Sequence, residues 1–208
     1  MNQQTPPPVP PTAAETFLLT DFGQCFTQLR HHDSQILDIM KFLLTGYTAV
    51  AGIAVGLHKF RFEGNKIDLT AAAYAVLCVG IVAGIVGLTL AIRNRIYFVK
   101  LGRYLNEYRE LFLGQNPLGF ENKSKMYDDP AFPPYLRWAS TQVWLCFLIA
   151  ALNSLLVTLV LVIEQGKDTD LGRQVGVFII ATAIQIGATI LWLWSKDWGK
   201  KAAPGKSN

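Results

Sequence analysis

The sequence predicts an all-α protein, a four-helix transmembrane bundle with a helical cytoplasmic extension. Of its 208 residues 51% are hydrophobic and 16% are charged, whereas soluble domains carry about 25% charged residues. Four long stretches contain no charged side chain, and most Lys and Arg residues lie outside them on one side. This composition excludes a disordered chain, a coiled coil, a collagen-like repeat and a disulfide scaffold.

The uncharged stretches are the predicted membrane spans, residues 42–57, 70–92, 143–163 and 175–194. Crossing the hydrocarbon core takes about 20 apolar residues. The first stretch is the shortest, but residues 36–41 extend it, and the ammonium of Lys41 can reach the interface. A soluble bundle of very apolar helices is the alternative. It would need a charged or polar face on each helix, and the last two stretches have no charged face.

The distribution of basic residues orients the chain. Fourteen of the 19 Lys and Arg residues lie in 1–41, 93–142 and 195–208, and five lie in the two short loops on the other side. Because basic loops stay in the cytoplasm, both termini are predicted to be cytoplasmic. The tryptophans agree, since all five flank the same interface: Trp138, Trp144, Trp192, Trp194 and Trp198.

The same segments give the domain organisation. We expect a disordered Pro-rich tail (1–11), a juxtamembrane helix (12–41), spans one and two (42–92), a cytoplasmic helical stalk and loop (93–142), spans three and four (143–194) and a cytoplasmic tail (195–208). Thr12 and Glu15 match a capping box that would start the first helix. Residues 70–113 contain no helix breaker, so one helix of about 66 Å should extend from the second span far into the cytoplasm. Residues 115–137 are broken by prolines, which leaves too little chain for a catalytic domain.

An apolar stripe follows each predicted cytoplasmic helix at steps of three and four residues, which places it on one helical face. The first stripe is Leu18, Phe22, Cys25, Leu29, His32, Ile36 and Met40, and the second is Tyr97, Leu101, Leu105, Tyr108 and Phe112. We expect the two stripes to pack on each other. Charged residues lie on another face of the second helix, where Glu107 and Glu110 favour ordinary intrahelical pairing with Arg103 and its neighbours.

No combination of residues suggests catalysis, so we expect no enzymatic activity, no cofactor and no metal. The three cysteines match no metal spacing, and the adjacent His31 and His32 point about 100° apart on a helix. A small intramembrane transferase is the enzymatic alternative, and it would have to use these histidines with Asp128 and Asp129. The spans also lack the charged residue that ion-coupled transporters and proton pumps usually keep at membrane depth.

Small and neutral polar residues inside the spans permit two interpretations. The pairs Gly52/Gly56 and Gly80/Gly84 let helices approach closely, either within one subunit or between subunits. The polar residues fall on stripes of spans three and four: Asn153, Ser154, Thr158, Thr182, Gln185 and Thr189. They can bond helices together, with the amides of Asn153 and Gln185 bonding each other or their symmetry mates, or they can line a pore.

The predicted stalk is basic and rich in tyrosine. Basic residues just outside a span usually meet anionic lipid headgroups, which accounts for Arg93 and Arg95. A ligand or partner site is the further hypothesis, with Arg95, Lys100, Arg103 and Arg109 as its residues. It would take a nucleotide, a short nucleic acid stacked on tyrosines, or a docked cytoplasmic protein.

Two segments next to the spans, LRHHDSQI (29–36) and RNRIYFVKLGRYLNEYREL (93–111), resemble small multi-span helical membrane effectors of bacterial anti-phage defence systems. The resemblance implies an effector that assembles in the bacterial inner membrane and collapses the ion gradient when a cytoplasmic partner or nucleotide signal releases it. It implies no role for any individual residue.

These expectations lead to two functional hypotheses. The first is a homo-oligomeric channel or pore-like protein in the lipid bilayer, taken as a tetramer and gated through its cytoplasmic helices. One subunit with four spans is too small to enclose a wide path, so assembly around an axis follows naturally. The alternative is a membrane anchor or sensor that recruits and regulates a cytoplasmic partner protein.

Overall fold

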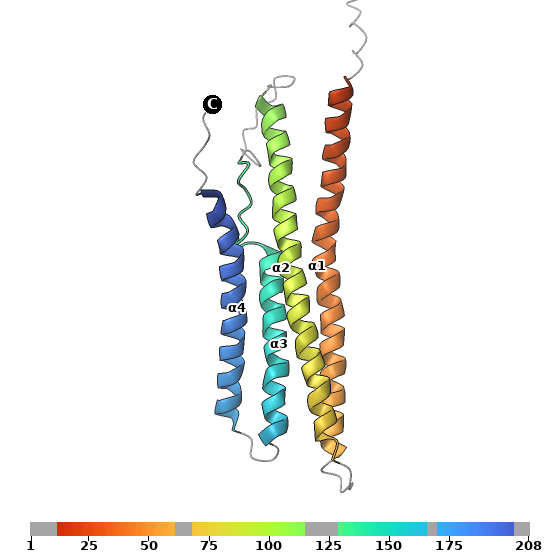
Figure 1. The fold of residues 1–208 in the computed structure, drawn as a ribbon, viewed down its shortest axis with the longest axis vertical. Helices are drawn as coiled ribbons and strands as arrows, with labels where there is room; N and C mark the ends of the chain where they lie inside the picture. The colour runs from red at the N-terminus through yellow and green to blue at the C-terminus, as the bar shows by residue number, and fades with distance from the viewer. Residues whose placement is uncertain (1–11, 61–67, 115–128, 166–169, 202–208) are drawn as a thin grey trace, which may run out of the picture.

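The computed structural model describes residues 12–60, 68–114, 129–165 and 170–201. They form four helices, α1 (Ala13–Phe60), α2 (Thr70–Gly114), α3 (Thr141–Gln165) and α4 (Leu171–Lys201) (Figure 1). The all-α prediction is confirmed, and each helix is long and apolar enough to cross a membrane. The Pro-rich tail and most of the loop predicted after Gly114 lie outside the described residues.

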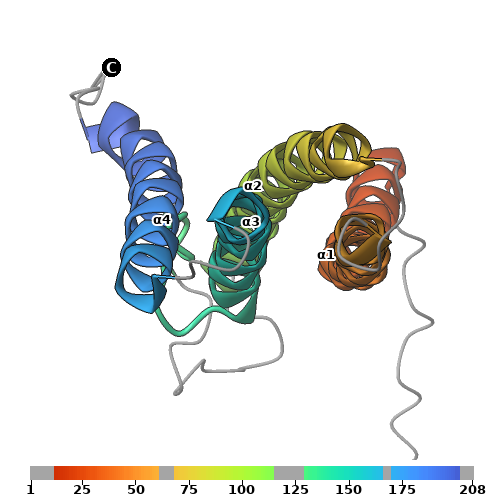
Figure 2. The ribbon, with the colours of Figure 1, turned by 90° about the horizontal axis from the view of Figure 1, so that it is seen from below.

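The helices stand in an open, curved row rather than in a closed bundle. α1 packs on α2, α3 packs on both of them, and α4 packs mainly on α3, so that α1 and α4 lie at opposite ends of the row (Figures 1 and 2). The sequence predicts four helices packed as a bundle without specifying their arrangement, and the structure arranges them in this row. The physical reason is that α4 is apolar around most of its surface, so lipid can cover the faces that water would have forced inward.

The long helix predicted to extend from the second span is α2, and α1 is of similar length. α1 has 48 residues and α2 has 45, about 72 Å and 68 Å at 1.5 Å per residue. Since a bilayer core is about 30 Å thick, both helices extend well beyond it at one end. We call this end the stalk, made of residues 13–41 of α1, 93–114 of α2 and the connecting segment 129–140. α4 also departs from expectation, because its helix continues through residues 195–201, which were predicted as part of the tail.

Local sequence explains where α1 begins and which face it buries. The Thr12 N–H donates to Glu15 Oε2 at 2.7 Å, and the Glu15 N–H donates to Thr12 Oγ1 at 3.3 Å, so the predicted capping box is confirmed. Every member of the predicted α1 stripe is buried or half-buried, with Cys25 and Ile36 the most enclosed. The stripe faces α2, as expected.

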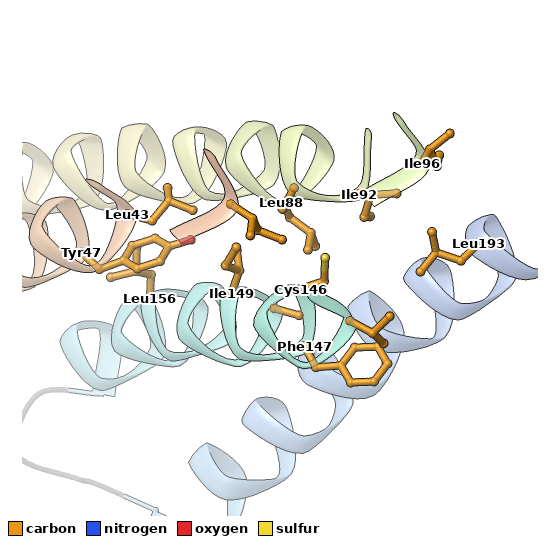
Figure 3. Close-up of a cluster of buried hydrophobic side chains, with 14 of the residues drawn as sticks. Leu43, Tyr47, Leu88, Ile92, Ile96, Cys146, Phe147, Ile149, Leu156 and Leu193 are labelled. Atoms are coloured by element: carbon orange, nitrogen blue, oxygen red, sulfur yellow. The ribbon is translucent and has the colours of Figure 1, made fainter. Parts of the chain in front are cut away.

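Glycines on α2 set the close approach of the spans. A Cβ at Gly80 would lie 2.7 Å from Val50 Cγ1, and one at Gly87 would lie 2.6 Å from Leu43 Cδ1. Between them, a Cβ at Gly84 would collide with the side chains of Tyr47 and Asn153. The core of the span region fills in around these contacts, and Figure 3 shows it: Leu43, Tyr47, Leu88, Ile92, Cys146, Phe147, Ile149 and Leu156.

The two GxxxG pairs therefore have different surroundings. Gly80 and Gly84 pack within the chain, whereas a Cβ at Gly52 or Gly56 would meet nothing within 4 Å. A role for Gly52 and Gly56 in subunit contacts stays a prediction.

Gly84→Ala is expected to lower the free energy of unfolding in detergent by about 1–3 kcal/mol, because the added methyl group overpacks the contact between α1, α2 and α3. Gly52→Ala is the matched control, because it makes the same change on an open helix face and should shift stability by less than about 1 kcal/mol. Thermal unfolding followed by circular dichroism measures both. Equal effects of the two changes would contradict this account of the packing.

Candidate functional site

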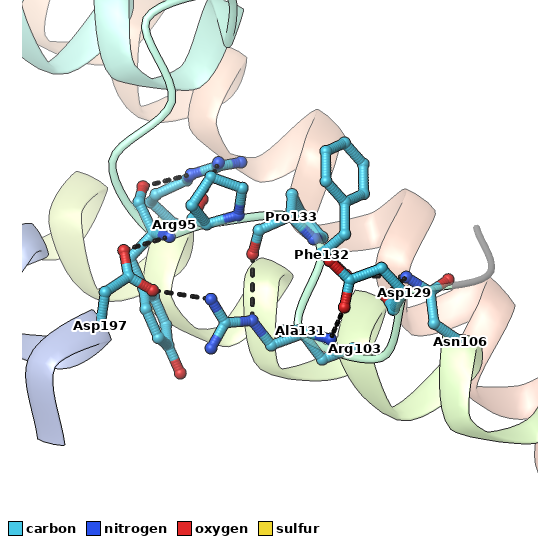
Figure 4. Close-up of polar contacts among 10 residues, drawn as sticks. Arg95, Arg103, Asn106, Asp129, Ala131, Phe132, Pro133 and Asp197 are labelled. Atoms are coloured by element: carbon cyan, nitrogen blue, oxygen red, sulfur yellow. Dashed lines mark hydrogen bonds and ion pairs between the residues drawn. The ribbon is translucent and has the colours of Figure 1, made fainter. Parts of the chain in front are cut away.

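Residues 129–137, which precede α3, lie against α2 and are held there by α2 side chains (Figure 4). Among them, residues 132–135 present four consecutive carbonyl groups, and the prolines at 133 and 134 have no N–H to offer. Asn106 Nδ2 donates to Phe132 O at 2.7 Å, and Arg103 Nε donates to Pro133 O at 3.0 Å. Arg95 donates to the next two carbonyls, at 3.0 Å from Nη2 to Pro134 O and at 3.2 Å from Nε to Tyr135 O. We call residues 129–137 the strap.

Arg103 also ties the strap to α4. Its Nη2 lies 2.7 Å from Asp197 Oδ1 in an ion pair whose arginine side chain is only 6% exposed. The Tyr135 N–H donates to the other carboxylate oxygen of Asp197 at 3.0 Å, and the Arg103 guanidinium lies 4.5 Å from the centre of the Tyr135 ring. The expected pairing of Arg103 with Glu107 on a solvated face is wrong. The carboxylate comes from 94 residues further along the chain, which no local spacing could indicate.

Arg95 is buried, with 2% of its surface exposed. Its third partner is Gln142 Oε1 at 3.4 Å, and Gln142 Nε2 in turn donates to Asp33 Oδ1 on α1 at 3.0 Å. The hydrogen bonds of Arg95 thus go to neutral oxygens. Burial lowers the pKa of Arg95 to about 10, so it remains charged near neutral pH. The expectation that Arg95 meets lipid headgroups is therefore wrong, because the strap covers it.

The other two basic residues of the predicted ligand site are placed differently. Lys100 is exposed, with its ammonium 5.7 Å from the centre of the Tyr97 ring. Arg109 is half-buried and donates to Asn106 Oδ1 at 3.0 Å. The structure therefore brings Arg95, Arg103 and Arg109 together beside the strap and leaves Lys100 outside that group.

Two polar contacts join α1 to α2 in the stalk. Asn94 Nδ2 donates to the backbone oxygen of His32 at 2.6 Å, and His32 Nδ1 lies 2.9 Å from Asn94 Oδ1. Further out, Asp21 accepts hydrogen bonds from the hydroxyls of Tyr104 and Tyr108. The bond to Asp21 is the main cause that raises the pKa of Tyr108.

The polar residues of the spans bond α3 to α4. Asn153 Nδ2 donates to Gln185 Oε1 at 2.9 Å, and Gln185 Nε2 donates to Ser154 Oγ at 3.0 Å. The prediction that the two central amides bond each other is confirmed. Thr158 and Thr189 donate to backbone oxygens of their own helices. A pore-lining role for any of these residues stays a prediction.

Sequence reasoning missed Tyr47, which belongs to the same region. Its hydroxyl and Asn153 Oδ1 are both buried, have no hydrogen-bond partner among the described residues, and face the same glycine, Gly84. One is a donor and the other an acceptor. Thr182 Oγ1 on α4 is a third buried oxygen without a partner in the described part of the chain. A lone tyrosine in the middle of an apolar span was the available signal.

A cavity of about 310 Å³ lies in the stalk between α1, α2 and the strap. Arg95 and Arg109 line it from α2, Phe26 lines it from α1, and Phe132 and Arg137 line it from the strap. In the described ranges, no three His, Cys, Asp or Glu side chains come close enough together to hold a metal ion.

Comparison with known protein families, with curated proteins and with solved structures finds no match to this chain. The description of the site therefore rests on its own geometry.

Asp197→Asn is expected to lower the free energy of unfolding by about 3 kcal/mol, since it leaves the buried Arg103 guanidinium without its counter-charge. Asp38→Asn is the matched control. Asp38 forms an ion pair with Lys41 in which both side chains are more than two-thirds exposed, so its loss should cost under about 0.5 kcal/mol. Thermal unfolding in detergent tests both, and a stable Asp197→Asn protein would show that the ion pair does not hold α4.

Proposed function

We propose that the protein is a homo-oligomeric, channel-like effector of the bacterial inner membrane, gated through its stalk. The observation that carries the proposal is the continuity of α1 and α2, which run without a break from one end of the molecule to the other. A displacement of the stalk ends is passed along these helices to the spans. No separate hinged domain interrupts the described part of this path.

The surface of α4 supports assembly into an oligomer. Many of its large apolar side chains are exposed in the single chain: Leu171, Val175, Ile179, Ile180, Ile184 and Leu191. Together with the open glycine face of α1, they offer surfaces at both ends of the helix row. Neighbouring copies, here taken as a tetramer, would cover these surfaces and close the row around an axis, while lipid would cover the remainder.

The neutral polar cluster supports the assignment of a conduction path beside α4. The α4 side chains of Gln185 and Thr189 contribute oxygens to this cluster. Thr182 adds a buried hydroxyl without a partner among the described residues. Rings of such neutral oxygens, repeated around an axis, would give a weakly selective path for ions. The stalk is assigned to the cytoplasm by its basic residues. The role in anti-phage defence rests on the resemblance of residues 29–36 and 93–111.

A membrane anchor or sensor is the second candidate, favoured by exposed apolar side chains on the stalk. Phe17 is 67% exposed and Leu19 is 60% exposed, and Leu111 near the end of α2 is also open. A cytoplasmic protein that covered one of these side chains would bury apolar surface that the single chain leaves open.

Gln185→Leu is expected to reduce the unitary conductance of reconstituted protein in planar bilayers severalfold, because it removes the largest polar group of the proposed path. Thr89→Val is the matched control, because the Thr89 hydroxyl lies on α2 and bonds only the Ile85 oxygen of its own helix. Its conductance should match that of the unchanged protein. The channel proposal would be overturned if the bilayers showed no current with any ligand tried and none when force was applied to the stalk.

Phe17→Ser separates the second candidate from the first. In an anchor, it should weaken binding of a purified cytoplasmic partner by about tenfold, as expected when a largely exposed aromatic anchor is lost from an interface. The control is Thr20→Ser, which keeps a hydroxyl on the same stalk surface. If conductance is intact and no partner shows a Phe17 dependence, the anchor hypothesis fails.

A further inference from the structure

The stalk cavity has the size of a small-molecule site and is partly open to solvent. Its volume of about 310 Å³ lies at the lower end of the range for ligand pockets, which runs from about 300 to 1,000 Å³. Three separate parts of the chain form its walls: α1, the same face of α2 that holds the strap, and the strap itself.

The described residues that line the cavity include Arg95 and Arg137 and no aspartate or glutamate. Arg109 also lines it and has a partner of its own in Asn106 Oδ1. The nearest carboxylate of the network, Asp197, is already paired with Arg103. The buried Arg95 guanidinium donates its described hydrogen bonds only to neutral oxygens. Burying a charge without a counter-charge is energetically unfavourable. An anion in the cavity would supply the counter-charge that the described lining lacks.

The remaining walls are aromatic and apolar. The Arg137 guanidinium lies 4.7 Å from the centre of the Phe132 ring, and that of Arg95 lies 5.6 Å from the centre of the Phe98 ring. Phe26 and Leu105 complete the apolar lining. The planar forks of guanidinium groups match the oxygens of phosphate and carboxylate groups, and two arginines suit the higher charge of a phosphate. The aromatic faces suit a flat or apolar body.

We propose that this cavity binds a phosphate-bearing anion with an aromatic or apolar body, its phosphate held by Arg95 and Arg137 and its body against Phe98 and Phe132. A soluble nucleotide and the headgroup of an anionic phospholipid share this chemistry. A ligand in this cavity would join the strap to α1 and α2 and could therefore regulate the protein. Only this regulatory role rests on the proposed function. Binding itself is independent of conduction.

The test measures binding of trinitrophenyl-ATP, a fluorescent nucleotide, to the full-length protein in phosphatidylcholine nanodiscs. Arg137→Gln should weaken binding about tenfold, since an interaction with a charged group is lost. The Arg137 side chain is exposed and lies over the Phe132 ring, and its backbone bond from the Ser140 N–H survives the substitution, so this variant should keep its fold. Arg95→Met tests the buried charge at a greater risk to folding. Lys100→Gln is the matched control. It removes the same charge from the same stalk, outside the cavity, and should change affinity by less than about twofold because salt screens distant charges.

Nanodiscs containing phosphatidylglycerol distinguish the two sources of phosphate. If the lipid is the natural occupant, trinitrophenyl-ATP binds the unchanged protein more weakly in these discs, and Arg137→Gln abolishes the difference. If trinitrophenyl-ATP binds with the same affinity in both lipids, the natural ligand is a soluble nucleotide. Either outcome supports a phosphate-binding site in the cavity. The proposal is overturned if no saturable binding occurs in phosphatidylcholine, or if Arg137→Gln and Lys100→Gln act equally. If the protein binds trinitrophenyl-ATP but conducts no current, only the channel proposal fails. If it conducts current but does not bind trinitrophenyl-ATP, only the proposed ligand site fails.

Discussion

The structure depends on four consecutive carbonyl groups that their own segment cannot satisfy. The prolines at 133 and 134 have no N–H to donate, so the carbonyl oxygens of residues 132–135 need donors from elsewhere. Arg95, Arg103 and Asn106 supply them from one face of α2. The same network reaches α1 through Asp33, α3 through Gln142 and α4 through Asp197. One set of polar contacts therefore joins all four helices at the stalk.

The span half of the molecule is held by a different kind of contact. In lipid there is little hydrophobic force between helices, so close packing and a few hydrogen bonds decide which helices adhere. α2 meets α1 and α3 across glycines, where backbones approach closely. α4 has instead the amide of Gln185, which bonds Asn153 and Ser154 of α3. The row stays open because the far face of α4 carries exposed apolar side chains that no described part of the chain covers.

The sequence allowed the helices to be predicted, but only part of the site. The extent of α2, the capping box at Thr12 and the buried stripe of α1 follow from neighbours within four residues, and the structure confirms them. The pairing of Asn153 with Gln185 could also be predicted, because two amides at midplane depth have few other partners. By contrast, the partners of Arg95 and Arg103 lie 30 to 94 residues away, and the path of the strap decides them. Tyr47 was missed because a single tyrosine in an apolar span matches no sequence motif. Its hydroxyl becomes notable only through its position beside Gly84, which the sequence does not show.

Among the four helices, α4 is the least extensively packed on the others. It is joined to them mainly by its packing on α3, with polar contacts near its start, near its middle and near its end. The contact at the end, Asp197, accepts from Arg103 and from the Tyr135 N–H of the strap. A change in the position of the strap therefore acts directly on α4. Since Gln185 is the polar contact that holds α4 at membrane depth, tilting α4 would strain the amide cluster first. The strap, the ion pair and the amide cluster thus form a continuous mechanical connection from the stalk cavity to the proposed conduction path.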